Sequence, residues 1–116
     1  MPSRSRSEPG DRGSVTAEFA VALPAVALVL AACLAAVQLV GVQVRLSDAA
    51  ADAARALGRG ESVGVAAGIA ERVGGAERLD SRADGDFVCV TLARSGGVLL
   101  AAVRLQAESC ALAGGR

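Results

Sequence analysis

The hydrophobic positions of this chain are concentrated in one long run near its N-terminus. No charged residue occurs from Phe19 to Val44, and Gln38 and Gln43 are the only strongly polar side chains in that run. A helix of about 20 residues is long enough to cross the hydrocarbon layer of a membrane, and alternation at period two, typical of strands, is absent. The pattern therefore predicts a transmembrane helix over residues 14–44, loosened or kinked at Pro24.

A fully buried helix of a soluble domain is the alternative interpretation of this run. The chain has 116 residues, and too few remain outside the run to surround such a helix on all sides. We therefore expect the membrane helix.

The pattern changes to an amphipathic helical period after Val44. Polar positions recur at near-helical spacing, and small apolar positions form the opposite stripe. Gly58 and Gly60 are typical of a helix end, so the long helix is expected to continue out of the membrane and stop there. The charged positions are Arg45, Asp48, Asp52, Arg55 and Arg59, and the apolar ones are Leu46, Ala50, Ala53 and Leu57.

A second, short helix is predicted to begin after Ser62, a favourable N-cap, and to end at Gly74-Gly75. Gly64 and Gly68 lie inside it and lower its intrinsic stability, so we interpret them as positions of close packing. Its expected apolar face consists of Val63, Ala66, Ala67, Ala70 and Val73.

The C-terminal third of the chain has the features of β-structure. Asp84-Gly85 is a turn dipeptide, and residues 86–93 (DFVCVTLA) are rich in strand-forming side chains. Residues 77–82 are a candidate edge strand, and a further strand is expected within Val98–Leu112. The expected fold class is α+β: a long N-terminal transmembrane helix continuing outside the membrane, a short second helix and a small antiparallel hairpin or sheet.

Composition limits the chemistry that the chain can perform. All twelve basic residues are arginine, the formal net charge is zero, and histidine is absent. The charge balance gives no reason to expect nucleic acid as a partner, and without histidine or a Cys-x-x-Cys pair the ordinary zinc sites and His-dependent nucleophilic catalysis are excluded. We expect no enzymatic activity, no catalytic or metal-binding residues, no cofactor and no small-molecule substrate.

The segment before the apolar run has a pattern of its own. Residues 1–12 (MPSRSRSEPGDR) are polar and contain Pro and Gly, so we expect them to be disordered. Gly13 follows, and Glu18 lies five residues beyond it, where the hydrophobic run begins. A cut after Gly13 would create an α-amino group at Ser14, which Glu18 could compensate near the positive start of the helix. The alternative is that Glu18 is only the polar flank of a signal anchor.

This order of features resembles the prepilin signal, and a larger part of the chain resembles one family. The segment GSVTAEFAVALP, the long helix and then QVRLSDAAADAARALGRGE look like the TadE-like minor pilins (pseudopilins) of the Tad/Flp type IV pilus system. The family motif D-A-A-x-x-A-A-R corresponds to residues 48–55, and the strand motif G-D-x-V-x-V to residues 85–90. The resemblance covers about Gly13 to Leu112.

The resemblance implies a structural role. Residues 1–13 would be a basic leader cleaved by a prepilin peptidase, 14–44 the transmembrane helix and 45–116 a small extracytoplasmic α+β domain. The chain would be a single-pass protein of the cytoplasmic membrane with a cytoplasmic N-terminus and its C-terminal domain outside; the cell surface is the alternative location. Its partners would be the membrane, the peptidase and other pilin-like subunits. The alternative function is an unprocessed, membrane-tethered binding module of the cell envelope.

Cys89 and Cys110 are a candidate disulfide, because both fall in the part expected to lie outside the membrane, where a small core benefits from a covalent link. Two strand registers compete. A tight turn at Gly96-Gly97 gathers the better apolar face but pairs Cys89 with Arg104. A wider loop over about residues 97–102 places Cys89 opposite Cys110. The apolar pattern favours the first register, and the cysteine pair and the TadE-like layout favour the second, which we adopt.

Overall fold

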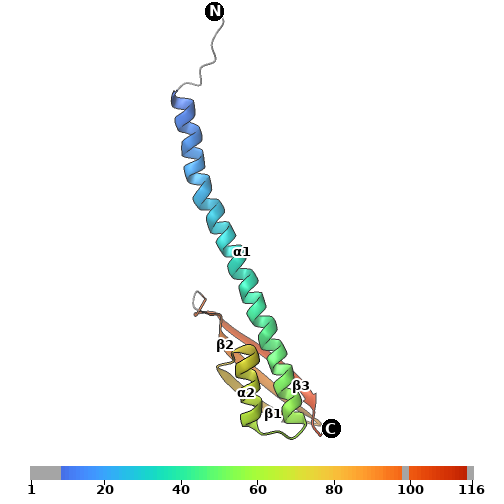
Figure 1. Cartoon of the computed structure of the whole chain (residues 1–116). Coiled ribbons are helices and arrows are strands. Elements are labelled where there is room, and N and C mark those ends of the chain that lie inside the picture. Colours follow the sequence, from blue (N-terminus) through green and yellow to red (C-terminus); the bar gives the residue numbers. More distant parts are fainter. Residues whose placement is uncertain (1–8, 98–99, 115–116) are drawn as a thin grey trace, which may run out of the picture. The chain divides into compact units, whose positions relative to one another are not determined.

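The computed structural model describes residues 9–97 and 100–114, with side chains from Gly13 onward. In chain order it contains α1 (Pro9–Gly58), α2 (Val63–Gly74), β1 (Arg78–Asp84), β2 (Phe87–Ser95) and β3 (Arg104–Leu112) (Figure 1). The three strands form one antiparallel sheet in the order β1-β2-β3. The expected α+β fold class is confirmed. The chain divides into two compact units, one up to Val37 and one from Gln38 onward.

Helix α1 begins earlier than expected. Residues 9–13, which we expected to be part of a disordered leader, are helical, and residues 1–8 lie outside the described part of the chain. Pro9 stands at the first helical position, where a missing N–H breaks no intrahelical hydrogen bond and the fixed φ of proline suits the helix. The helix can therefore extend backwards from the apolar run to this residue. It is continuous through Pro24.

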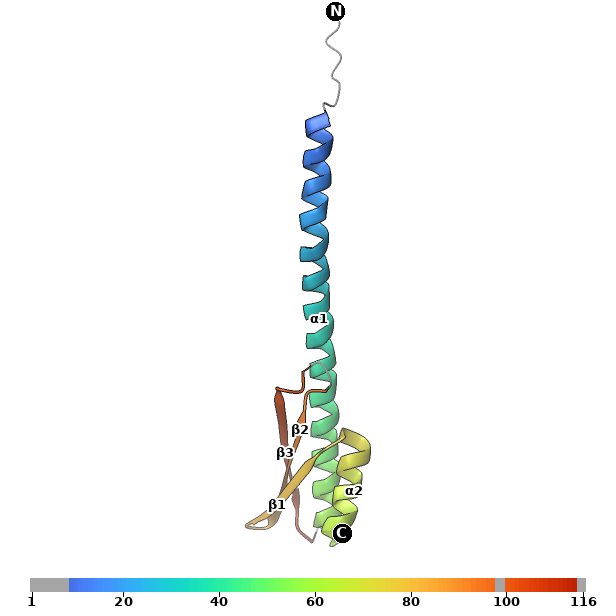
Figure 2. The same ribbon diagram turned by 90° about the vertical axis from the view of Figure 1, so that its left-hand side faces the viewer.

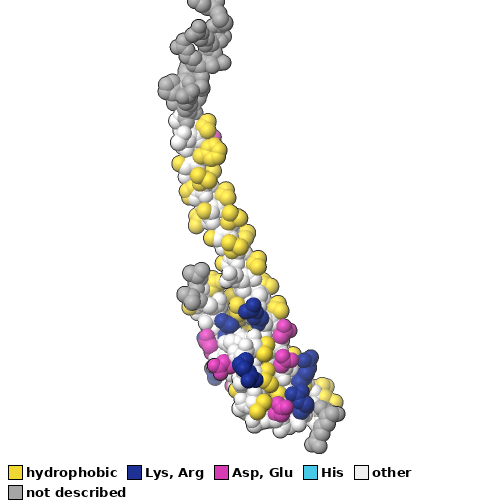
Figure 3. All heavy atoms as spheres, viewed as in Figure 1, with side chains coloured by type: hydrophobic (Ala, Val, Ile, Leu, Met, Phe, Trp, Pro, Cys, Tyr) yellow, Lys and Arg dark blue, Asp and Glu magenta, His cyan; other side chains and the backbone are white. Residues whose placement is uncertain are grey.

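In the first unit, every side chain from Gly13 to Leu34 is exposed. One helix in the described part of the chain is long and apolar enough to cross a membrane, and none of its most apolar window is buried by the protein. A core helix of a soluble domain would bury such residues against its own chain. Figure 3 shows the hydrophobic side chains along this part of α1, while charged side chains gather on the second unit.

In the second unit, the last turns of α1 supply most of the core. The expected stripe is confirmed: Leu46, Ala50 and Ala53 are fully buried, and Leu57 packs against them. The opposite face carries the charges, including an i,i+3 ion pair between Arg55 and Asp52, 3.1 Å apart. Because this stripe consists mainly of alanine, α2 and the sheet can approach the helix axis closely. Figure 2 shows both beside the C-terminal half of α1.

Helix α2 has the expected ends but a different contact face. Ser62 caps its first turn by accepting a hydrogen bond from the Val65 N–H, and Gly75 ends it in the left-handed conformation. Its buried residues are Ala66, Ala70 and Gly74, whereas Val63 and Val73, expected on the apolar face, are exposed. The small residues face α1 because only they allow its alanine stripe to come close.

The close-packed glycine of α2 is Gly74 and not the expected pair. A Cβ atom built on Gly74 would lie 2.7 Å from the Ala49 Cβ. A Cβ on Gly68 would meet nothing within 4 Å, and one on Gly64 only the Ser62 hydroxyl at 3.7 Å. The prediction for Gly64 and Gly68 was therefore wrong, since the buried face of α2 consists of Ala66, Ala70 and Gly74 and leaves both glycines outside it.

The first hairpin turns one residue later than the Asp84-Gly85 dipeptide indicated. Asp84 pairs with Phe87, so the two-residue turn consists of Gly85 and Asp86. Gly85 has φ +60° and the following aspartate has a negative φ, as in a type II′ turn, which requires glycine at its first central position. The candidate edge strand near residues 77–82 is confirmed as β1, shifted to Arg78–Asp84.

The second hairpin has the wider loop. Cys89 pairs with Cys110, Val88 with Ala111 and Leu92 with Ala107, which confirms the register that we adopted. The loop occupies residues 96–103, of which 98 and 99 lie outside the described residues. Its base is closed by the Gly96 N–H, which donates to the Val103 carbonyl at 2.9 Å.

Candidate functional site

The expected processing residues lie together on α1 in the first unit. Gly13, Ser14 and Glu18 are all exposed and helical. Ser14 and Glu18 are four residues apart, so they share one face of the helix as neighbours on successive turns. An α-amino group created at Ser14 would therefore start its helix one turn from the Glu18 carboxylate.

Gly13 is the point in this segment where α1 is intrinsically weakest. Glycine lowers helix stability by roughly 1 kcal/mol relative to alanine, and a Cβ on Gly13 would meet nothing within 4 Å, so packing does not require a glycine here. Gly13 therefore lowers the local stability of the helix without serving a packing role in the described structure.

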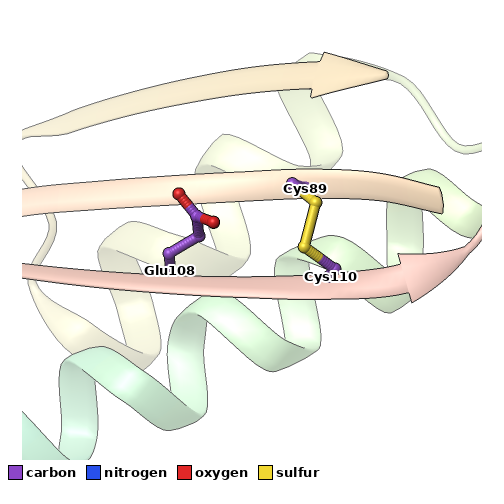
Figure 4. Close-up of side chains that lie close together, drawn as sticks. All are labelled: Cys89, Glu108 and Cys110. Atoms are coloured by element: carbon purple, nitrogen blue, oxygen red, sulfur yellow. A yellow bond between two sulfur atoms is a disulfide. The ribbon is translucent and has the colours of Figure 1, made fainter. Parts of the chain in front are cut away.

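The cysteines lie in the second unit, on the outer face of the sheet away from the helices. Cys89 on β2 and Cys110 on β3 are joined by a disulfide, with an S–S distance of 1.99 Å (Figure 4). Cys89 is 2% exposed, whereas Cys110 is exposed to solvent. Cys33, the remaining cysteine, is unpaired and exposed in the apolar part of α1.

Glu108 lies beside the disulfide, on the same face of β3 as Cys110 (Figure 4). The two sulfur atoms and a Glu108 carboxylate oxygen lie within 4.8 Å of one another, a spacing that a metal ion could use. The carboxylate is, however, held across β2: it accepts hydrogen bonds from Arg82 at 2.9 Å and from the Thr91 hydroxyl at 3.1 Å. With the sulfurs bonded to each other and unable to act as thiolates, the cluster is a cross-strand network and not a metal site.

A second polar cluster lies at the C-terminal end of β2, next to the start of β1. Glu77 accepts hydrogen bonds from the Ser95 hydroxyl at 3.0 Å and from the Ser95 N–H at 3.3 Å. The two hydrogen bonds from Ser95 lower the pKa of Glu77 below its usual value of 4.5; desolvation opposes them, and the charges of Arg104 and Arg94 add to the lowering. A lowered pKa keeps this carboxylate ionised, so the cluster fixes the start of β1 and Glu77 is not an activated acid.

Sequence reasoning missed two side chains that tie the second unit together. Arg94 donates from Nη1 to the Gly74 carbonyl at 3.0 Å, and so satisfies a free carbonyl at the C-terminus of α2. Gln43 on α1 donates from Nε2 to the Gln106 carbonyl of β3 at 2.8 Å. Each pair is separated by 20 or more residues, and no local pattern signals such contacts.

Comparison with known proteins identifies the N-terminal segment. Residues 13–55 match the family model described as TadE-like protein. This segment is TadE-like. It contains the Gly13–Glu18 spacing, the whole apolar run and the alanine stripe of α1, so the TadE-like resemblance expected from the sequence is confirmed. The TadE-like match does not reach α2 or the sheet.

A relative of this TadE-like chain is the protein named Apoptosis inhibitor Rv3655c of Mycobacterium tuberculosis. The two are 40% identical over 85 residues, which is 71% of this chain and 66% of the relative. The chain thus spans about two thirds of the length of that relative. No solved structure matches the chain.

Proposed function

We propose that this chain is a structural minor pilin or pseudopilin that takes part in assembling a Flp-type (Tad) pilus or a related secretion apparatus. The observation that carries the proposal is the TadE-like segment: Gly13 followed by Ser14, Glu18 one turn further on, and an apolar helix whose most apolar window the described residues leave unburied. A pilin helix is first held by lipid and then by the helices of other subunits, so it has to be apolar on all sides.

In this proposal a prepilin peptidase removes the leader after Gly13, and α1 then crosses the cytoplasmic membrane once. The N-terminus faces the cytoplasm and residues 45–116 fold outside. Three arginines lie close to the helix on each side, so the orientation rests on the terminal amine, on the acidic residues after the helix and on the TadE-like resemblance. The small α+β domain is held to α1 by the alanine stripe and by the bond from Gln43 to β3. These contacts tie the domain to the part of α1 that belongs to the second unit, from Gln38 onward.

Glu18 has a defined role in this mechanism. A carboxylate among apolar neighbours is costly in a membrane or in a bundle of helices unless a positive charge compensates it. The new α-amino group at Ser14 of the same or of a neighbouring subunit supplies that charge. The pair would set how far one helix slides along the next, and so would align a subunit as it joins the assembly.

The proposal is tested by replacing Glu18 with Gln, which keeps the shape and removes the charge. We expect the protein to insert into the membrane as the wild type does, and to lose most of its co-purification with other pilin-like subunits and most pilus formation. Glu71→Gln, an exposed acid on α2, is the matched control and should behave as the wild type. Normal co-assembly of Glu18→Gln would contradict the assigned role.

The 40% identical relative supports a second candidate function. Its name assigns it inhibition of apoptosis, which is an action on another protein or pathway and not a filament role. By that analogy the small domain would be a binding module tethered by an uncleaved α1. The two candidates differ in processing: a minor pilin loses its leader after Gly13, and a tethered module keeps it.

A further inference from the structure

The loop between β2 and β3 is unusual for a part of the chain expected to face water. Residues 96–103 contain only Gly, Val, Leu and Ala. In its described C-terminal half, Ala101 and Ala102 are exposed, and Leu100 and Val103 are half-buried. An apolar loop on a small domain that is otherwise rich in surface charge indicates a surface that a lipid bilayer or another molecule covers.

The position of this loop along α1 is fixed by contacts within the second unit. Gln43 of α1 bonds to Gln106 of β3, and a Cβ on Gly96 would lie 3.1 Å from the Leu39 Cδ1. The loop therefore lies beside Leu39, on the N-terminal side of Gln43. Figures 1 and 2, from perpendicular directions, both show the described ends of the loop at the end of the sheet opposite the connection between α1 and α2.

This level of α1 still belongs to the apolar run. The helix at this point exposes Val40, which is 63% accessible, and Val44, which is 54% accessible. The run from Phe19 to Val44 is about 39 Å long as a helix, longer than the ~30 Å hydrocarbon layer. If the helix spans the membrane, its last turns and the adjacent loop lie at the lipid–water interface.

Arginines mark the polar boundary of this surface on both elements. Arg45 is the first charged residue after the run on α1, and Arg104 is the first after the loop. Both are exposed, and Arg104 makes only a long ion pair, 3.8 Å, with Glu77. Guanidinium groups next to an apolar surface suit lipid phosphates, to which they donate paired hydrogen bonds.

We propose that the β2–β3 loop is a second membrane contact of this protein. Residues 100–103, with Leu39 and Val40 of α1, sit in the interfacial layer of the bilayer, and Arg45 and Arg104 bind the phosphates of its headgroups. The contact rests on the proposed function, because it requires α1 to span the membrane. It would hold the small domain down on the lipid surface, and entry into an assembly would then require lifting the loop.

The test uses the full chain in vesicles of zwitterionic and anionic phospholipid. In a Cys33→Ala background, Ala101→Cys and, as the matched control, Glu61→Cys each carry an environment-sensitive fluorophore. Glu61 lies on the loop between α1 and α2, at the opposite end of the second unit. The fluorophore at position 101 should show a blue-shifted emission, and lipids that carry a nitroxide on the headgroup should quench it strongly. The fluorophore at position 61 should show neither effect. Equal, water-like signals at both positions would overturn the proposal.

Two further readouts separate this result from failure of the anchor and from self-association. Cys33 of the otherwise unaltered chain should resist a membrane-impermeant maleimide until detergent is added. If Cys33 reacts at once, the hypothesis that α1 spans the membrane is wrong. If Cys33 is protected while the fluorophore at position 101 stays in water, only the proposed contact of the loop with lipid is wrong. A signal at position 101 that rises with the protein-to-lipid ratio would identify a second copy as the occupant and overturn the lipid assignment.

A substitution of Arg104 tests the proposed binding of lipid phosphates. Arg104→Gln should reduce the quenching at position 101 in anionic vesicles towards the value in zwitterionic vesicles, because it removes one of the two guanidinium groups at the boundary. Arg59→Gln, at the far end of α1, is the control and should leave the quenching unchanged. Equal quenching in Arg104→Gln and in the unaltered chain would remove Arg104 from the contact.

Discussion

At the scale of single residues, the contact between α1 and α2 depends on one glycine. A Cβ on Gly74 would lie 2.7 Å from the Ala49 Cβ and 3.2 Å from the Arg45 carbonyl oxygen, so the helices would have to move apart. We expect Gly74→Ala to destabilise the second unit by about 1–3 kcal/mol, the usual cost of overpacking.

The matched variant is Gly68→Ala on the same helix. Nothing lies within 4 Å of its added Cβ, so the higher helix propensity of alanine should stabilise the unit by up to about 1 kcal/mol. Urea unfolding of the full chain in detergent measures both variants. Similar midpoints for the two would contradict the assigned contact.

The sequence could not distinguish these glycines. Apart from Ile69, Glu71 and Arg72, helix α2 consists of Gly, Ala and Val, so several of its faces offer small apolar side chains. Which face is buried depends on where α2 crosses α1, at Ala49 and Leu46, and that crossing is set by the connection through Ser62 and by the sheet. The caps at Ser62 and Gly75 were predictable, because capping depends only on neighbouring residues.

At the scale of elements, the disulfide links the central strand to an edge strand. We expect Cys89 and Cys110 to resist alkylation in the folded protein until a reductant is added. Replacing both with Ala should lower the free energy of unfolding by roughly 3 kcal/mol, the chain-entropy estimate for a closed loop of about 20 residues. Cys33→Ala, in the other unit, is the control and should not change the stability of the sheet. Alkylation of both cysteines without reduction would show that the pair is not bonded.

The strands themselves were predictable from their own residues. The choice between the two hairpin registers depended on more than the pattern of apolar residues. The tight-turn register offered Cys89 an arginine partner and a better local apolar face. In the structure the wider loop makes its own contact with α1 beside Leu39, and Ala107 and Ala111 face the core together with Leu105. The two alanines suit the alanine stripe of α1, a relation between elements more than 50 residues apart that no hairpin rule contains.

At the scale of the whole molecule, the described residues form an apolar helical segment that none of them buries and a small unit with a core of its own. The long helix, its amphipathic continuation and the α+β class followed from the spacing of hydrophobic residues, which is a strong signal in long elements. The start at Pro9 did not follow, since breaker residues before Gly13 indicated disorder. The TadE-like match to residues 13–55 covers the apolar helix and its amphipathic continuation.

The measurement that tests the central claim most directly is the mass of the membrane-bound protein, made with and without a prepilin peptidase. The account predicts a mature chain beginning at Ser14 only when the peptidase is present. It also predicts an uncut chain for Gly13→Leu and normal cutting for Gly41→Leu, a glycine of the same helix that also has no neighbour within 4 Å of an added Cβ. Intact Met1 on all of the membrane-bound protein in cells that contain the peptidase would contradict it.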